Sequence, residues 1–250
     1  MSSVPDKVLV VTGGSRGIGA AVANLAGDRG YAVAVAYQSA ERQAADIVQN
    51  IAQAGSKAAA FQVDVTSPDS VERMFVAVEQ TLGRPAALVN SAGSTGGVRP
   101  ILELEPPMLQ SIVATNLFGT IYCIRAAALR MARSLGGSGG AIVNLSSEAA
   151  RFGGNRLAAY AAAKAGVSTF TIAAARELAA EGIRVNAVSP GVIATDQHAG
   201  NDAQRTASLL ASIPLGRMGT AAEVAQSVLW LLSDEASYIT GSVLSIHGGR

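Results

Sequence analysis

The fold of this chain is decided by the stretch Lys7-Val8-Leu9-Val10-Val11-Thr12-Gly13-Gly14-Ser15-Arg16-Gly17-Ile18-Gly19. Residues 7–12 form a β-branched and apolar run typical of a buried strand, and a helical pattern over 18–29 follows the glycines directly. Glycines let the backbone turn tightly and approach a ligand, while free amides at the start of a helix attract phosphate oxygens. The stretch therefore predicts a strand, a phosphate-binding turn and a helix, although the glycines taken alone also fit a tight turn without a ligand.

An alternation of apolar runs and helical patterns continues along the chain. Strands are expected at 7–12, 32–37, 57–63, 86–89, 141–145, 183–188 and 242–246, and helices at 18–29, 41–54, 107–135, 160–180 and 223–232. A further helix begins at Ser67-Pro68-Asp69, which has the residues of a cap and first turn. Right-handed crossovers place helices on both faces of such a sheet. We expect the α/β class: one doubly wound parallel sheet of seven strands, in a single domain spanning 1–250.

Composition argues against several classes of protein. The net charge of +1, the 4% of aromatic residues and the lack of a basic cluster argue against nucleic-acid binding. Cys123 is the only cysteine, and with two histidines the chain lacks the usual ligands of a zinc site, so we expect no metal. The N-terminal residues lack an export signal and no apolar run approaches membrane-spanning length. We therefore expect a cytoplasmic protein without membrane contact.

Tyr160 and Lys164 lie four residues apart in a helical pattern, so both side chains point from the same face. A nearby positive charge favours phenolate and lowers the pKa of a tyrosine from its usual value of about 10. The pair could therefore perform acid-base chemistry, or it could be a surface pair.

Ser147 precedes Tyr160 by thirteen residues and follows the apolar run 141–145. The glycine turn, this serine and the Tyr160–Lys164 pair, in that order, resemble the short-chain dehydrogenase/reductase family over nearly the whole chain. The closest likeness is to 3-oxoacyl-carrier-protein reductases and related carbonyl reductases. The resemblance implies a Rossmann-type domain that binds a nicotinamide dinucleotide and assembles as a homotetramer through the helices of Asn116 and Tyr160.

The resemblance also implies catalytic roles. Tyr160 exchanges a proton with the substrate oxygen, and Ser147 hydrogen-bonds that oxygen. Lys164 lowers the pKa of Tyr160 and binds the nicotinamide ribose, while Asn116 positions a water that leads towards Lys164. Ser146 is the alternative to Ser147, and Asn116 could instead be a satisfied core or interface residue.

Asn90-Ser91-Ala92-Gly93 resembles the family's Asn-Asn-Ala-Gly, with Ser91 in place of the second asparagine. Asp64 occupies the position of the acidic residue that contacts the adenine in the family it resembles, although an aspartate after a strand also organises turns. The residues that the resemblance places at the cofactor are Gly13, Ser15, Arg16, Gly17, Ile18, Gly19, Tyr37, Gln38, Ser39, Asp64, Val65, Asn90, Ala92, Gly93, Tyr160, Lys164, Pro190, Gly191, Ile193 and Thr195.

The end of the second strand bears on the choice between NADP(H) and NAD(H). It reads Tyr37-Gln38-Ser39 and lacks the acidic residue that commonly holds the ribose hydroxyls of NAD. Arg16 and Arg42 offer planar donors suited to a 2′-phosphate. The sequence favours NADP(H), with NAD(H) possible; the alternative is that both arginines are solvated surface charges.

The expected activity is reduction of a carbonyl, in a 3-oxoacyl compound or another ketone, to an alcohol by hydride transfer. One alternative is an NAD-dependent alcohol, sugar or steroid dehydrogenase, and another is a dinucleotide-binding sensor without catalysis. Residues 196–217 are expected to cover the substrate, with Glu148, Arg151, Phe152 and Asn155 lining its pocket. The sequence does not identify the substrate.

Overall fold

The computed structural model of the protein describes residues 7–195 and 210–250. Its main sheet has seven parallel strands. In spatial order these are β3 (Ala58–Gln62), β2 (Ala32–Tyr37), β1 (Val8–Thr12), β4 (Pro85–Asn90), β5 (Gly140–Leu145), β6 (Ile183–Pro190) and β9 (Val243–Ile246). The predicted doubly wound α/β sheet is confirmed. The strand order reverses between β1 and β4, which is where ligands bind in such sheets.

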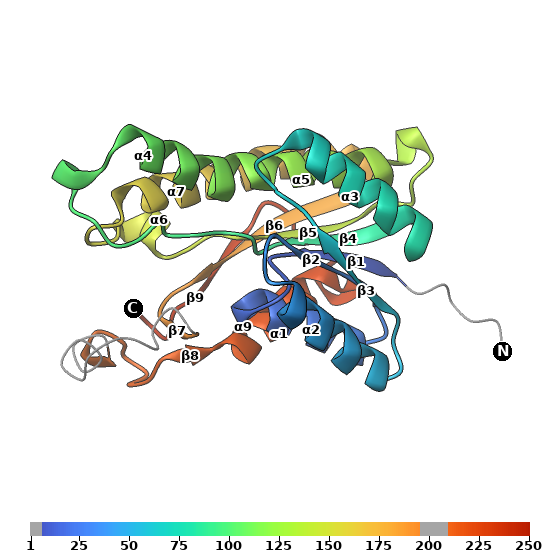
Figure 1. Cartoon of the computed structure of the whole chain (residues 1–250), viewed down its shortest axis with the longest axis horizontal. Helices are drawn as coiled ribbons and strands as arrows, with labels where there is room; N and C mark the ends of the chain where they lie inside the picture. Colours follow the sequence, from blue (N-terminus) through green and yellow to red (C-terminus); the bar gives the residue numbers. More distant parts are fainter. Residues whose placement is uncertain (1–6, 196–209) are drawn as a thin grey trace.

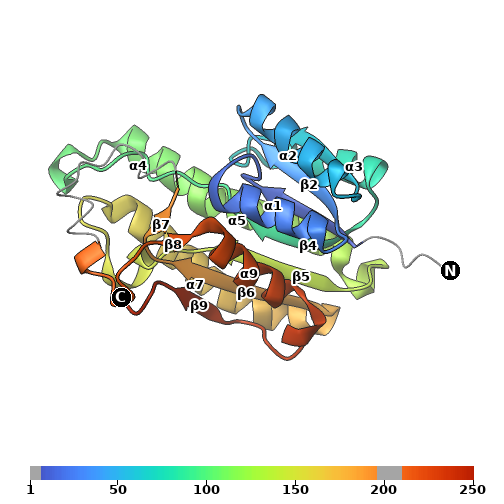
Figure 2. The same cartoon turned by 90° about the horizontal axis from the view of Figure 1, so that it is seen from below.

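Helices cover both faces of the sheet (Figure 1). One face carries α3 (Pro68–Thr81), α4 (Pro106–Val113), α5 (Gly119–Met131), α6 (Ala149–Phe152) and α7 (Ala158–Leu178). Figure 2 looks onto the other face, which carries α1 (Gly17–Asp28), α2 (Glu41–Gln53) and α9 (Ala221–Leu232). Short 3-10 turns lie at Ile101–Glu103, Arg133–Leu135, Ala179–Glu181 and Asp234–Ala236.

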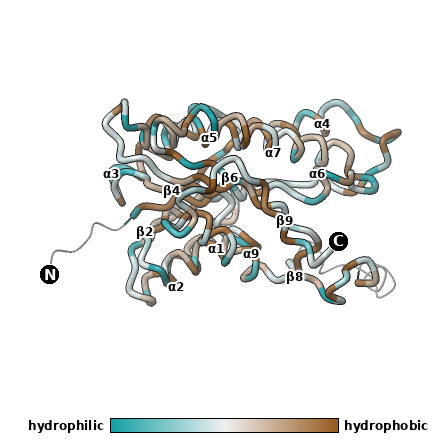
Figure 3. Tube along the Cα trace, turned by 180° about the vertical axis from the view of Figure 1, so that it is seen from behind, coloured by the Kyte–Doolittle hydropathy of each residue, from teal (hydrophilic) through white to brown (hydrophobic). Residues whose placement is uncertain are grey.

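The buried side chains form one apolar core on each face of the sheet. In β1, Val8 and Val10 belong to the core that includes Phe75 of α3, whereas Leu9 and Val11 belong to the core that includes Leu229 of α9. This alternation follows from the two-residue period of a strand. The strands are therefore hydrophobic at nearly every position, as the brown colour of the central strands in Figure 3 shows.

Two helix starts are fixed by side-chain caps. The hydroxyl of Ser67 accepts a hydrogen bond from the amide of Ser70, which confirms the cap expected before α3. At α9, Thr220 and Glu223 bond each other's backbone amides in a capping box. Each cap satisfies amides that the helix leaves free.

The helix expected at 107–135 is divided. A π-helical turn, η2 (Ala114–Phe118), separates α4 from α5 and contains Asn116. A second unexpected feature is a small parallel ladder between β7 (Ile193–Ala194) and β8 (Gly219–Thr220). Both features depend on long-range contacts that local periodicity does not record.

By length and composition alone, the helical segment 106–131 could cross a membrane. Gln110, Asn116 and Arg125 interrupt this segment, so it is not an apolar run of the kind whose absence was expected. In the fold, its buried Ile124 and Met131 belong to the core beneath α5, and Arg130 bonds carboxylates of α3. Packing within the domain buries 44% of the most apolar window of this segment, while Phe118 stays exposed.

Candidate active site

The glycine turn after β1 has the close-packed backbone that its sequence predicts. Gly13 has φ +64°, in the left-handed region, and a Cβ there would lie 2.9 Å from the backbone of Ala92. A Cβ on Gly19 would lie only 2.2 Å from the carbonyl oxygen of Gly13. Since ordinary side chains fit neither position, the turn leaves its backbone bare next to the start of α1.

The loops after β1 and β4 are joined by the hydroxyl of Thr12, which accepts hydrogen bonds of 3.2 Å from the amides of Ser91 and Ala92. Asn90, just before this loop, donates 2.9 Å to the side chain of Asn144 on β5. Asn144 in turn donates 2.9 Å to Thr171 of α7. This buried polar chain holds β4, β5 and α7 in fixed positions.

The four residues predicted to be catalytic come from α7, η2 and the loop after β5. The hydroxyl of Ser147 lies near enough to the phenol of Tyr160 to lower its pKa, and Nζ of Lys164 lies 5.8 Å from the centre of the Tyr160 ring. Ser146, the alternative to Ser147, is 4% exposed and turns towards α7, where it bonds the carbonyl of Lys164 and the hydroxyl of Ser168. The geometry brings Ser147, not Ser146, to the tyrosine.

Lys164 is buried at 4% exposure and donates 2.6 Å to the carbonyl of Leu145, the last residue of β5. Burial lowers its pKa to about 8, because the low-dielectric interior disfavours the charged form. The ammonium is thus held between β5 and α7, behind the tyrosine.

The expected lowering of the Tyr160 pKa by Lys164 is not what this geometry gives. Burial raises the pKa of the phenol above its ordinary value, and the hydrogen bond with Ser147 acts in the opposite direction. The phenol is therefore protonated near neutral pH in this structure.

Asn116 is fully buried in η2. Its Nδ2 donates 2.7 Å to the carbonyl of Ser94 and 2.8 Å to that of Ile112, while its Oδ1 has no hydrogen-bond partner among the described residues. A Cβ on Gly93 would lie 2.7 Å from Oδ1 of Asn116 and 3.5 Å from Nζ of Lys164. Gly93 therefore keeps open a small space that Asn116 and Lys164 both border.

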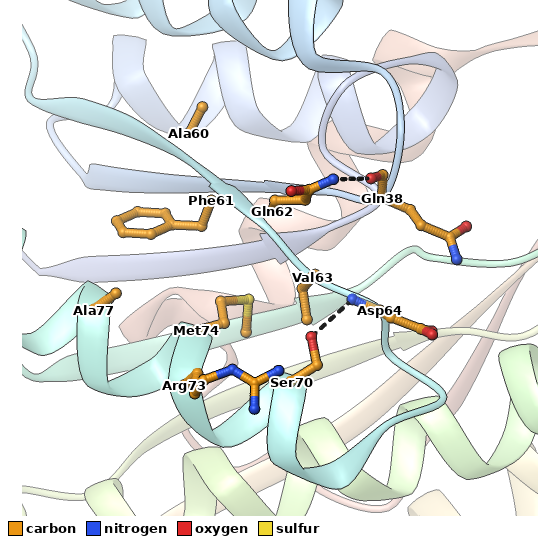
Figure 4. Close-up of a pocket in the computed structure, with 10 residues that line it drawn as sticks. All are labelled: Gln38, Ala60, Phe61, Gln62, Val63, Asp64, Ser70, Arg73, Met74 and Ala77. Atoms are coloured by element: carbon orange, nitrogen blue, oxygen red, sulfur yellow. Dashed lines mark hydrogen bonds between the residues drawn. The ribbon is translucent and has the colours of Figure 1, made fainter.

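The adenosine end of the cofactor is predicted at the ends of β2 and β3, where Gln38 and Asp64 lie. A cavity of about 550 Å³ there is lined by Gln38 and Asp64 and by Arg73 of α3 (Figure 4). None of the four catalytic candidates lines it. The carboxylate of Asp64 accepts hydrogen bonds from the amide and hydroxyl of Thr66, so this residue does organise the following turn. Val65 is buried, at 8% exposure.

The polar residues expected near a 2′-phosphate are accessible. Gln38, Ser39, Arg16 and Arg42 are exposed, whereas Tyr37 is buried at the end of β2. Neither arginine makes a hydrogen bond or ion pair with its side chain in the part of the chain that the structure describes. The two guanidinium groups therefore remain available to an anion.

The predicted nicotinamide side is formed by the loop after β6. The amide of Gly191 donates 2.9 Å to the carbonyl of Ile246, and Ile193 is buried in the β7–β8 ladder. A Cβ on Gly17 would contact the methyl of Thr195 at 3.8 Å. The loop after β6 thus approaches the glycine turn, although the two are far apart in sequence.

Glu148 follows Ser147 directly and is buried at 7% exposure, yet its Oε2 has no partner among the described residues. Phe152 is exposed and stacks under Arg151, whose guanidinium lies 4.9 Å from the ring centre. Sequence reasoning missed Arg99 and Arg156, which line a small pocket together with Tyr160. Their separation by 57 positions gave no local signal.

The described residues contain no cluster of three His, Cys, Asp or Glu that could hold a metal. His247 accepts a hydrogen bond from the amide of Gly249. His198 and the greater part of the predicted lid, 196–209, lie outside the described residues.

Comparisons with known proteins identify the class. A family model described as enoyl-(acyl carrier protein) reductase matches residues 13–250. The chain is 44% identical over 245 residues to the uncharacterized oxidoreductase YgfF of Escherichia coli K12, covering 97% of this chain and 99% of that protein. It is 38% identical over 243 residues to the 3-oxoacyl-(acyl-carrier-protein) reductase FabG of Staphylococcus aureus Mu50, covering 97% of each.

A solved structure agrees with this assignment. A Sinorhizobium meliloti 1021 protein, provisionally described as a short-chain alcohol dehydrogenase, matches with a TM-score of 0.92 and 36% identity, over 97% of this chain and 95% of that one. The chain belongs to the short-chain dehydrogenase/reductase family and is an NAD(P)-dependent oxidoreductase.

Proposed function

We propose that this chain is an NADP(H)-dependent reductase that converts a carbonyl, in a 3-oxoacyl compound or another ketone, to an alcohol. The observation that carries the proposal is the nearness of the hydroxyls of Ser147 and Tyr160 to each other, beside the buried ammonium of Lys164. Two hydroxyls converging on one point suit a single substrate oxygen that gains charge and then a proton.

The residues fit a nicotinamide dinucleotide. Gly13 and Gly19 let the turn pack closely against Ala92 and against itself, so that the start of α1 can offer its amides to a pyrophosphate. The unpartnered Oδ1 of Asn116 marks a polar space beside Lys164. Unpaired Arg16 and Arg42, without an acidic residue at the end of β2, support NADP(H) over NAD(H).

When bound, the reduced nicotinamide supplies the hydride. Tyr160 donates its proton to the carbonyl oxygen, and Ser147 hydrogen-bonds that oxygen as it becomes negative. Burial raises the pKa of the phenol, so the phenol carries the proton that the acid role requires. Lys164, held by the carbonyl of Leu145, is positioned to bind ribose hydroxyls and return a proton through a water at Oδ1 of Asn116.

The assembly, the lid and the location in the cell belong to the same proposal. Phe118 and Ile172, on η2 and α7, are exposed apolar residues on the helical layer that we propose to be buried in a homotetramer. Residues 196–217 form the proposed lid. A cytoplasmic location fits the single, buried Cys123.

The first test is titration of the purified protein with NADPH and NADH, followed by reduction of an acetoacetyl thioester. Tyr160→Phe should lower turnover at least about a hundredfold while NADPH affinity stays unchanged. Arg16→Ala should weaken NADPH binding and leave NADH binding as it is. A preference for NADH together with oxidation of alcohols or sugars would favour the alternative of an NAD-dependent dehydrogenase. Dinucleotide binding without any turnover would favour the alternative of a non-catalytic sensor.

A further inference from the structure

Two arginines line the same small pocket as Tyr160. Arg99 lies in the segment after β4, and Arg156 lies just before α7. The floor of the pocket includes the apolar side chains of Met108 and Ile112. The pocket holds about 10 Å³, roughly the space of one water, so a larger ligand group would lie at its mouth, where Arg99 and Arg156 are exposed.

The two arginines are held together through the backbone. The amide of Arg99 donates 2.9 Å to the carbonyl of Arg156. Arg156 has φ +61° and is the only residue other than glycine with a positive φ in the described chain. Such a conformation is unfavourable for an arginine and persists only when the surroundings fix it. The hydrogen bond between the backbones of Arg99 and Arg156 therefore joins the loop after β4 to the start of the helix that carries Tyr160.

The positive charges at this pocket are poorly compensated. The Arg156 side chain forms no hydrogen bond or ion pair with any residue that the structure describes. Arg99 has one ion pair, 3.9 Å to the carboxylate of Glu103, and both of these side chains are more than half exposed. An ion pair of that length and exposure is weak, so both guanidinium groups remain available to a ligand.

We propose that Arg99 and Arg156 form a subsite for a carboxylate of the substrate, whose ketone lies at Tyr160 and Ser147. The inference rests on the proposed function and adds the substrate class, a short oxo acid. A guanidinium offers paired donors that match a carboxylate. Because the arginines share a pocket with Tyr160, the proposal is a short molecule that carries both the carboxylate and the ketone.

Binding tests the subsite independently of turnover. Calorimetry on the full chain, with and without saturating NADPH, should compare butanoate with butanamide, which differ in charge but hardly in shape. We expect butanoate to bind at least about tenfold more tightly, the usual effect of a hydrogen bond to a charged group. Arg156→Asn and Arg99→Gln should each remove most of this preference.

Asparagine suits position 156 because it tolerates a positive φ, so the variant should keep its thermal stability. The matched control is Arg176→Gln. Arg176 is an exposed arginine on α7, about 24 Å along the helix axis from Tyr160. This control should retain the preference. Equal affinity for butanoate and butanamide, or a preference that survives Arg156→Asn, overturns the subsite. Displacement of butanoate by an equal concentration of inorganic phosphate also overturns it, because the site would then bind anions without regard to shape.

Turnover of acetoacetate and methyl acetoacetate separates this inference from the proposed function. A preference for the acid in kcat/KM that Arg156→Asn lowers about tenfold supports both. Reduction of the ester without selective binding of butanoate would support the proposed function and contradict the subsite. Selective butanoate binding without reduction of any oxo compound retains the subsite and removes the proposed function.

Discussion

Oδ1 of Asn116 faces Gly93 so closely that a methyl group on the glycine would lie 2.7 Å from it. The same methyl group would lie 3.5 Å from Nζ of Lys164. A single glycine therefore preserves the space between the two polar groups that the proposed proton path needs.

Gly93→Ala should damage catalysis more than stability. The added methyl fills the space at Oδ1 of Asn116, so kcat should fall more than about tenfold, with a loss of about 1–3 kcal/mol in the free energy of unfolding from overpacking. Steady-state kinetics and urea unfolding measure the two effects. The control is Gly166→Ala on α7, where the nearest atoms belong to the flexible end of the Leu117 side chain at 3.0 Å. Equal activity of the two variants would contradict the role of this space.

The two neighbouring serines, Ser146 and Ser147, should have different functions, one in stability and the other in catalysis. Ser147→Ala removes the hydroxyl that bonds Tyr160 and should lower kcat at least about a hundredfold with little change in Tm. Ser146→Ala breaks buried hydrogen bonds to α7 and should cost about 1 kcal/mol of stability while leaving most of the activity. Kinetics and thermal unfolding of both variants decide, and the reverse pattern would return Ser146 to the catalytic role.

Lys164 should make stability depend on pH. Its folded-state pKa of about 8 lies below its ordinary value of 10.5, so the unfolded chain binds more protons between these values. Stability contributed by this site therefore rises with pH across that window, by a total of about 3 kcal/mol at most.

Lys164→Met is the comparison that isolates this contribution, because it removes the titrating group and keeps an unbranched side chain. The difference in unfolding free energy, wild type minus variant, should increase from pH 7.5 to pH 10. A difference that stays flat across this range would show that the ammonium is better solvated than its burial indicates.

Arg130 should hold α5 against α3. It bonds Glu72 at 2.6 Å and Glu79 at 2.8 Å and lies 5.2 Å above the Phe75 ring. Arg130→Met should cost about 2 kcal/mol, and Arg125→Met, an exposed change on the same helix, should cost much less.

This contribution also has a pH dependence of known sign. The hydrogen bond from Arg130 lowers the pKa of Glu72 below its ordinary value of 4.5. The stability is therefore present above that value and is lost as pH falls through the lowered pKa. Urea unfolding at pH 7 and pH 3 should show the gap between wild type and Arg130→Met closing in acid.

Much of the fold was predictable because its signals are local. The strand of residues 8–12 is apolar at its first four positions, the glycines follow it at once, and Ser67-Pro68 marks the start of a helix. The Tyr160–Lys164 spacing likewise puts two side chains on one helix face. The π turn at Asn116 was not predictable, because it coincides with bonds from this side chain to Ser94 and Ile112 in the folded chain.

Sequence periodicity by itself determined the doubly wound parallel sheet, since it fixes which faces of the strands and helices are buried. The resemblance carried by the glycine turn, Ser147 and the Tyr160–Lys164 pair indicated the family and the four catalytic candidates. Tertiary structure decided that Ser147 rather than Ser146 meets Tyr160, that burial raises the pKa of the phenol, and that Arg99 and Arg156 share its pocket. These outcomes depend on burial and on contacts between distant segments. Desolvation and long-range packing exist only once the chain has folded, so no local pattern encodes them.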